Sequence, residues 1–115
     1  MAGPEITIEP ADGAWSIRSQ GAVLGESDRA LILREGDLEP VVYFPRDDIQ
    51  MAFFDVSDKT THCPHKGDAT HFHMVGRNRT EPNVAWSYEA PKKQVAQIKG
   101  YLAFYPNAVT VESVS

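Results

Sequence analysis

This sequence has a single cysteine, no long apolar run and no export signal, and each of these absences removes a class of protein. Because Cys63 is the only cysteine, no disulfide can form within the chain. No apolar run approaches the roughly 20 residues that a membrane-spanning helix needs. The first residues also lack the basic segment and apolar core of a secretory signal. We therefore expect a cytoplasmic protein with no membrane partner.

Positive charge is in short supply as well. Eleven Lys and Arg residues stand against sixteen Asp and Glu residues, which gives a formal net charge of −5. This balance favours solubility and works against attraction to nucleic acid or to anionic membranes. The sequence also lacks a phosphate-binding loop, a dinucleotide-binding glycine pattern and a Gly-x-Ser-x-Gly elbow. Neither a cofactor nor a nucleic-acid partner is therefore indicated.

What the chain does contain is enough apolar residues for one core. Its 115 residues are 42% apolar, which is typical of a single domain that folds without disulfides or structural metal. Short runs rich in β-branched and aromatic residues alternate with turn residues, and this pattern predicts antiparallel strands joined by tight turns. The predicted strands are Glu5–Glu9, Ala14–Ser19, Ala22–Glu26, Ala30–Glu35, Val41–Phe44, Lys59–Cys63, Ala69–Val75, Asn83–Glu89, Gly100–Tyr105 and Val109–Val114.

Helix is scarce in this pattern. A short helix is predicted at Pro91–Lys99, where proline occupies the first turn and Gly100 follows the last. A turn or short helix is predicted at Arg46–Met51. The predicted fold class is therefore mainly β, with residues 1–115 in one compact domain of short antiparallel sheets, barrel-like or sandwich-like, with one or two short helices.

Strand periodicity indicates which side chains point together. Residues two apart share a face of a strand, so Leu31, Leu33 and Glu35 fall on one face of the predicted fourth strand. If this face meets the core, Glu35 projects inward and requires a cation, a hydrogen-bonding partner or solvent in a cleft. The simpler alternative is that the strand twists and Glu35 reaches water.

Aromatic side chains show the same periodicity. Val84, Trp86 and Tyr88 share one face of their predicted strand, and Tyr43 lies on an apolar face of another. Such stripes usually belong to the core. Tyr and Trp also carry a polar atom that seeks a partner when buried, so they often line the mouths of pockets. Both interpretations stay open.

Residues 61–68 hold the densest group of reactive side chains. Pro64 and Gly67 mark a turn between two strands, so Cys63 and Lys66 should lie on a loop held by a hairpin, a common location for binding or catalytic groups. A nearby cation would favour the thiolate of Cys63 and make it nucleophilic. The alternative is that Cys63 packs as a small buried apolar residue.

All four histidines fall within twelve residues, from His62 to His73. His71 and His73 share a strand face with their Cα atoms about 6–7 Å apart, a spacing that suits two ligands of one metal ion. Cys63 or His65 could supply a third ligand across the hairpin. The alternative is a solvated strand face, and the sequence lacks a Cys-x-x-Cys pair or a His-Glu-x-x-His pattern. Metal binding through His62, His65, His71 and His73 therefore stays an alternative hypothesis.

Seven segments stand in a distinctive order and spacing: Trp15, Ser27-Asp28-Arg29-Ala30, Glu35, Tyr43-Phe44-Pro45-Arg46-Asp47-Asp48-Ile49, Cys63-Pro64-His65-Lys66-Gly67-Asp68-Ala69, Trp86-Ser87-Tyr88-Glu89 and Tyr101-Leu102-Ala103-Phe104-Tyr105. Together they resemble the family known as domain of unknown function 427, also labelled nucleotidyltransferase-like, over about residues 15–111. The resemblance implies a compact, mainly β fold with strongly bent sheets, and it implies no reaction or cofactor. The Gly-Ser and spaced aspartates typical of nucleotidyltransferases are missing from this chain.

The leading hypothesis is a small-molecule site, binding or catalytic, in a cleft beside the Cys63–Gly67 loop. Lys66, helped by Arg18, would bind an anionic group of the ligand. Glu35 would act as a general acid or base, or hold Lys66 in place. Cys63 would be a nucleophile or simply packed. Three aromatic residues would form the walls: Tyr43, Trp86 and Tyr88.

A second hypothesis belongs to a different class of protein. In it the chain is an interaction or structural module without chemistry, and Glu35, Arg18 and Lys66 form a buried ion-pair network. The oligomeric state is left open, with a homodimer among the alternatives.

Overall fold

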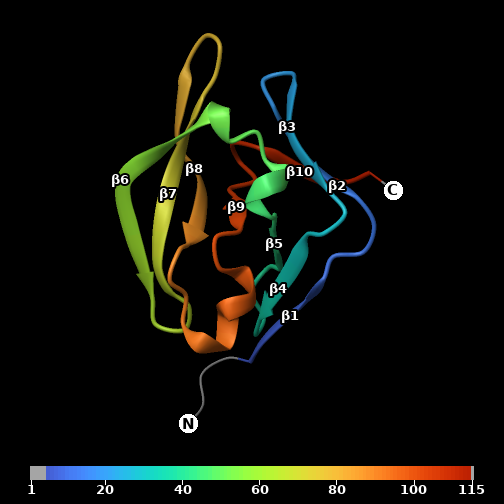
Figure 1. Ribbon diagram of the computed structural model, residues 1–115, viewed down its shortest axis with the longest axis vertical. Helices are drawn as coiled ribbons and strands as arrows, with labels where there is room; N and C mark the ends of the chain where they lie inside the picture. Colours follow the sequence, from blue (N-terminus) through green and yellow to red (C-terminus); the bar gives the residue numbers. More distant parts are fainter. Residues whose placement is uncertain (1–4, 115) are drawn as a thin grey trace.

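Ten short strands make up most of residues 5–114, the part of the chain that the computed structural model describes. They are β1 (Ile6–Pro10), β2 (Trp15–Ser19), β3 (Ala22–Ser27), β4 (Leu31–Glu35), β5 (Val41–Tyr43), β6 (Phe54–Cys63), β7 (Gly67–Val75), β8 (Thr80–Tyr88), β9 (Leu102–Phe104) and β10 (Thr110–Ser113). Three 3-10 helices lie between them, η1 (Arg46–Asp48), η2 (Met51–Phe53) and η3 (Lys93–Ile98) (Figure 1). The predicted mainly β fold class is confirmed.

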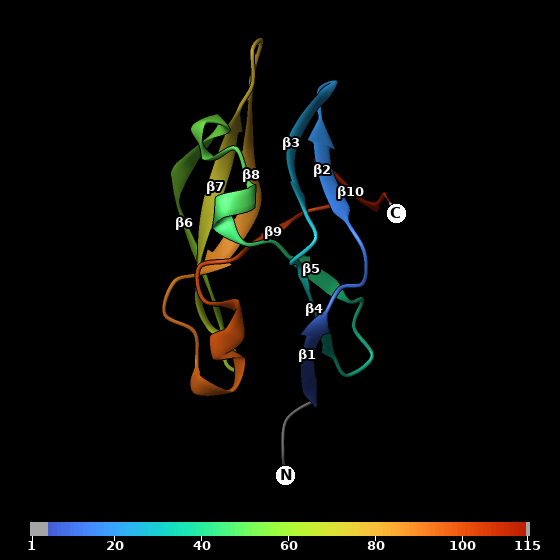
Figure 2. The same cartoon turned by 45° about the vertical axis from the view of Figure 1, so that its right-hand side comes forward.

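The strands form three antiparallel sheets, in the orders β1-β4-β5, β10-β2-β3 and β6-β7-β8-β9. Tight turns produce this meander. In the β2–β3 turn, for example, Gln20 and Gly21 both have positive φ values, 51° and 77°, as a two-residue turn between twisted strands requires. Figure 2 shows two layers, with β6, β7 and β8 in one, the strands from β1 to β5 and β10 in the other, and β9 crossing between them.

The two layers are joined where β5 ends. The backbone N–H of Phe44 donates to the carbonyl of Leu102 at 2.8 Å, and the N–H of Leu102 donates back to Phe44 at 2.9 Å. This isolated bridge places the end of β5 beside β9. As a result the first sheet continues into the third one through a single pair of residues.

Apolar side chains from the layers pack in two clusters. The first cluster contains Ile17 and Leu24 from the N-terminal sheets together with Phe44, Phe72 and Phe104. The second cluster is smaller and lies around β4, β5 and η3: Leu33, Tyr43, Ala69, Tyr88, Val95, Ile98 and Ala103. Most of these side chains are less than 5% exposed, so burial of apolar surface is the main source of stability. The second cluster forms the floor beneath the predicted site.

Three local predictions differ from the structure. Strand β6 begins at Phe54, well before the predicted start at Lys59, because Phe54–Val56 also pair with β7, on the far side of a register shift between Val56 and Thr60. The predicted helix at Pro91–Lys99 is a 3-10 helix over Lys93–Ile98, broken at Val95. Val84 packs in the first cluster, whereas Trp86 lies against the second.

A register shift in the β7–β8 pair accounts for the position of Val84. The shift falls between Phe72 and Met74 of β7, and the opposing residue Asn83 has a positive φ of 51°. Such a bulge turns the following side chain toward another face.

No helix among the described residues combines the length and apolar character needed to cross a membrane.

Candidate functional site

The hairpin between β6 and β7 fixes the position of Lys66. Cys63 and Gly67 pair across the hairpin, and the Lys66 N–H donates to the Cys63 carbonyl at 3.2 Å. Gly67 has a φ of +114°, a region that L side chains rarely adopt, so glycine is needed there. The Lys66 carbonyl in turn accepts from the N–H of Lys92 at 2.9 Å. The turn is therefore held on both sides, and the Lys66 side chain points inward.

Glu35 lies at the inner end of β4 and meets this lysine. Its Oε1 accepts a hydrogen bond from Lys66 Nζ at 2.6 Å, and both side chains are only 11% exposed. Glu35 follows Leu33 on the same face of the strand, and both residues line one pocket. The inward orientation with a cationic partner is therefore the observed one, and the alternative in which Glu35 reaches water is wrong.

The pair opens onto a pocket of about 240 Å³ between the β4–β5 edge and the inner face of β6–β8. This volume is below the roughly 300–1,000 Å³ of most ligand pockets, so the cavity has room only for a small molecule. Its walls combine aromatic rings and aliphatic side chains with one ammonium, two carboxylates and one threonine hydroxyl. The lining residues are Leu33, Glu35, Leu38, Glu39, Val41, Tyr43, Thr61, Lys66, Trp86, Tyr88 and Tyr105.

The aromatic walls hold one another in place. Trp86 Nε1 donates to the Tyr43 hydroxyl at 3.3 Å, and the two rings meet edge to face at 6.3 Å. The Trp86 ring also lies 4.5 Å from the ring of Tyr105. Burial raises the pKa of Tyr43 far above its usual value, and it also raises the pKa of Tyr88. Both phenols therefore stay neutral and available as hydrogen-bond donors at physiological pH.

Cys63 lies beside Lys66 and is half-buried. Burial lowers the pKa of Lys66, but hydrogen bonds to Glu35 and Cys63 outweigh this effect and raise it above its usual value. Lys66 therefore carries its full charge at neutral pH. An ammonium can donate three hydrogen bonds, so Lys66 keeps N–H donors for a ligand beyond its bond to Glu35.

Arg18 does not belong to this group. It lies on the exposed side of β2 and forms an ion pair with Glu112 at 3.1 Å. It lines two other hollows but not the one at Lys66. Of the seven residues predicted to act together, the structure brings five to one pocket and places Cys63 against its lysine, and it leaves Arg18 outside.

The four histidines are distributed over different environments. His62 is exposed and lies 2.7 Å from Asp68. His71 is fully buried, and its Nε2 lies 3.2 Å from the Tyr105 hydroxyl. His73 accepts a hydrogen bond from the Asn83 N–H at 3.1 Å. Within residues 5–114, no three His, Cys, Asp or Glu side chains are grouped closely enough to hold one metal ion.

Other segments singled out in the sequence serve packing between elements. Ser27 donates to Asp48 at 2.6 Å, and the Arg29 guanidinium donates to the same carboxylate at 3.0 Å. These bonds attach the β3–β4 turn to η1. Arg46 attaches η1 to the end of β8, because it donates to Glu89 at 2.5 Å and to Ser87 at 3.3 Å. Both sets of contacts lie away from the pocket.

Sequence reasoning missed Tyr105 as a site residue. It follows β9, and it lines both the pocket at Lys66 and the larger hollow next to it. The available signal was an aromatic residue placed directly after a buried strand. Without the position of β9 beside β8, this signal does not show which cavity the ring lines.

The fold and the pocket together define a small, mainly β domain with one buried ion pair at an aromatic-walled pocket. A family model described as Domain of unknown function (DUF427), labelled NTP_transf_9, matches residues 7–115. The chain belongs to this family, as its motifs indicate. No curated protein matches the sequence.

Proposed function

We propose that this protein binds a small acidic molecule in the pocket between β4–β5 and β6–β8. The observation that carries the proposal is the Lys66–Glu35 pair, which is buried, charged and open to a cavity walled by aromatic rings. Burying two charges costs several kcal/mol each before they attract one another, and apolar residues would fill such a site at lower cost. A pair that also faces a cavity is thus better explained by a ligand than by packing.

Each part of the pocket has a role in this proposal. An N–H of Lys66 that does not bind Glu35 donates to a carboxylate or other acidic oxygen of the ligand. The rings of Tyr43, Trp86 and Tyr88 contact its apolar part. Glu35 keeps Lys66 charged and oriented, and it is the group able to exchange a proton with the ligand if a reaction takes place. Cys63 is packed against Lys66 and supports its position.

One observation favours the second candidate function, an interaction or structural module. The Lys66–Glu35 contact is short, and both charges are already paired. If the protein is such a module, the pocket is a gap in the packing that holds no ligand, and no small molecule stabilises the protein selectively.

The cytoplasm remains the proposed location under either function, because a reduced thiol at Cys63 suits a reducing compartment.

Filling the pocket tests the proposal. Thr61 and Thr60 are neighbours on β6, but only Thr61 lines the pocket, since successive side chains of a strand face opposite sides. Thr61→Trp should therefore block the pocket, and Thr60→Trp is the matched control. Small carboxylic acids, phosphate esters, neutral analogues and amines are screened by thermal shift against the wild type and both variants.

We expect at least one acid to raise the Tm of the wild type and of Thr60→Trp but not that of Thr61→Trp. A ligand at one hundred times its Kd adds about 2.7 kcal/mol to stability, which is readily measured. If every compound shifts Thr61→Trp as much as the wild type, the pocket does not bind a ligand. If amines or neutral compounds bind and acids do not, the role assigned to Lys66 is wrong.

A further inference from the structure

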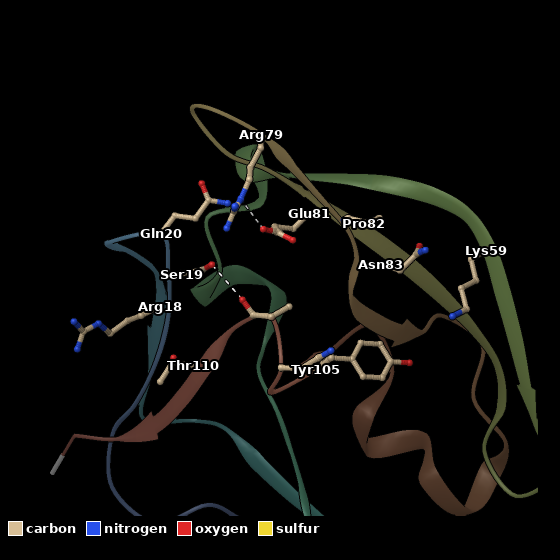
Figure 3. Close-up of a pocket in the computed structure, with 12 residues that line it drawn as sticks. Arg18, Ser19, Gln20, Lys59, Arg79, Glu81, Pro82, Asn83, Tyr105 and Thr110 are labelled. Carbon is tan, nitrogen blue, oxygen red and sulfur yellow. Dashed lines mark hydrogen bonds and ion pairs between the residues drawn. The ribbon is translucent and has the colours of Figure 1, made fainter.

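A second, larger hollow lies on the other side of Tyr105. It has a volume of about 680 Å³ and is bordered by β2, by β6, by the start of β8 and by the segment after β9 (Figure 3). Three cationic side chains line it, Arg18, Lys59 and Arg79, against the single carboxylate of Glu81. In a chain with a formal net charge of −5, this is a local concentration of positive charge that attracts anions.

The two arginines of the hollow are already paired. Arg18 forms an ion pair with Glu112 at 3.1 Å, and Arg79 forms one with Glu81 at 2.7 Å. Figure 3 also shows the Arg18 side chain directed away from Lys59. Lys59 forms no ion pair with any residue between 5 and 114. Lys59 is therefore the cation that remains available in the hollow.

Asn83 presents a second donor next to Lys59. Both residues are anchored on Ser57, whose Oγ accepts from the Lys59 backbone N–H at 3.0 Å and donates to the Asn83 Oδ1 at 2.5 Å. Because the Asn83 oxygen accepts this bond, its amide NH₂ is left as a donor. In Figure 3 the Asn83 amide and the Lys59 ammonium lie on the same side of the hollow.

The backbone of Asn83 is held in an unusual conformation. Its φ of +51° is in the left-handed region, and its N–H is fixed by the ring of His73 at 3.1 Å. Asparagine adopts this region more readily than most residues, and the bulge between β7 and β8 places Asn83 there. Here the contacts with Ser57 and His73 orient the Asn83 side chain.

Tyr105 completes this side of the hollow. Its hydroxyl lies 3.2 Å from Nε2 of the buried His71, so the ring has a fixed position. Burial and, after it, the positive charge of Lys59 lower the pKa of His71. Lys59 is an exposed residue, and in Figure 3 its ammonium and the Tyr105 hydroxyl lie on the same side of the hollow.

We propose that this hollow binds a phosphate-type oxyanion through the ammonium of Lys59 and the amide of Asn83, with the Tyr105 hydroxyl beside them. A compact ammonium and a neutral amide donor suit the several acceptor oxygens of such an anion. Arg18 and Arg79 lie farther out, and their charges are compensated by Glu112 and Glu81. The site is independent of the pocket at Lys66, from which it is separated by the Tyr105 ring.

The test is a titration of the ¹⁵N-labelled protein with sodium phosphate at constant ionic strength, monitored by NMR. We expect saturable shifts at the Asn83 side-chain and backbone amides and at residues around Tyr105. Lys59→Gln should weaken binding about tenfold, the effect of losing one charge-assisted hydrogen bond. Lys92→Gln, which removes an exposed lysine that does not line the hollow, is the matched control and should bind as the wild type does.

Asn83→Gly supplies a second variant that does not depend on the charge. Glycine adopts the positive φ without strain, so this variant keeps the backbone conformation while it removes the amide donor and the contact with Ser57. It should also weaken phosphate binding. Phenyl phosphate is titrated in parallel to distinguish a free anion from a phosphomonoester, and tighter binding of either supports the site. The absence of saturable shifts at Asn83, or an equal loss of affinity in Lys59→Gln and Lys92→Gln, would overturn the proposal.

Discussion

Lys66 and Glu35, which lie 31 residues apart in the chain, meet at 2.6 Å in a setting where each side chain is only 11% exposed. Each charge is accommodated because the other is present. Removing one partner leaves an uncompensated charge in a poorly solvated site, whereas removing both leaves none. This relationship makes the two substitutions strongly non-additive.

Our first prediction concerns this pair. Lys66→Met and Glu35→Gln should each lower the free energy of unfolding by about 3 kcal/mol, and the double variant should lose much less than the sum. Urea unfolding followed by tryptophan fluorescence measures all four proteins. Additive losses would show that the two side chains do not share their stabilisation.

The second prediction concerns the carboxylate of Asp48. The hydrogen bond from Ser27, followed by the contact with Arg29, lowers the pKa of Asp48 below its ordinary value of 3.8. A carboxyl group whose pKa is lower in the folded protein than in the unfolded chain stabilises the fold at pH values above the unfolded-state pKa. This stability is lost as the pH falls through the folded-state pKa. Asp48→Asn should therefore be less stable than the wild type at pH 7, by about 1 kcal/mol, and the difference should close below pH 3.8.

Asp47 provides the control for this experiment. It is adjacent to Asp48 and exposed, and it accepts no hydrogen bond from any described side chain. Asp47→Asn should leave the stability at pH 7 almost unchanged. Equal losses from the two substitutions would contradict the role given to the Ser27 contact.

The third prediction concerns the buried His71. Burial, followed by the charge of Lys59, lowers its pKa below the ordinary value of 6.5. The unfolded chain therefore takes up a proton at this residue before the folded protein does, and stability falls as the pH decreases from 6.5 through the folded pKa. NMR titration of the His71 ring should give a midpoint below 6.5, and Lys59→Gln should move that midpoint upward. A midpoint at or above 6.5 would show that the ring is solvated.

The fourth prediction concerns the alkaline limit of stability. Burial raises the pKa values of Tyr43, Tyr88 and Tyr105 above the ordinary value of 10.0. A phenol whose pKa is higher in the folded protein than in the unfolded chain stabilises the fold at pH values below the unfolded-state pKa. This contribution is lost as the pH rises above 10.0. Absorbance titration should show these phenols ionising together with unfolding. Tyr43→Phe should remove one of the late-titrating groups, and reversible ionisation of every tyrosine near pH 10 would contradict the burial.

Sequence periodicity predicted the parts of the structure that depend on local alternation. The strands lie close to their predicted positions, and the parity of Leu31, Leu33 and Glu35 indicated the inward direction of the carboxylate as one of two alternatives. The same argument indicates an outward position for Arg18, because its neighbour Ile17 is fully buried. Placing Arg18 with Lys66 disregarded this alternation.

The remaining parts of the site depend on relationships between distant segments. Tyr105 reaches the pocket only because β9 lies beside β8, and no local pattern encodes that pairing. The position of Asn83 depends on a bulge opposite β7, which changes the direction of single side chains without a clear signal in composition. Lys59 lies at the register shift of β6 between Val56 and Thr60, and no local sequence pattern marks such a shift.

The reciprocal backbone bonds between Phe44 and Leu102 have a consequence for how the chain folds. These residues are separated by more than half of the sequence, and closing so long a loop has a large entropic cost before any contact offsets it. The bridge between Phe44 and Leu102 can therefore form only late, once the hairpins on both sides exist. Folding should be a slow and cooperative process in which both halves of the molecule acquire their final packing together.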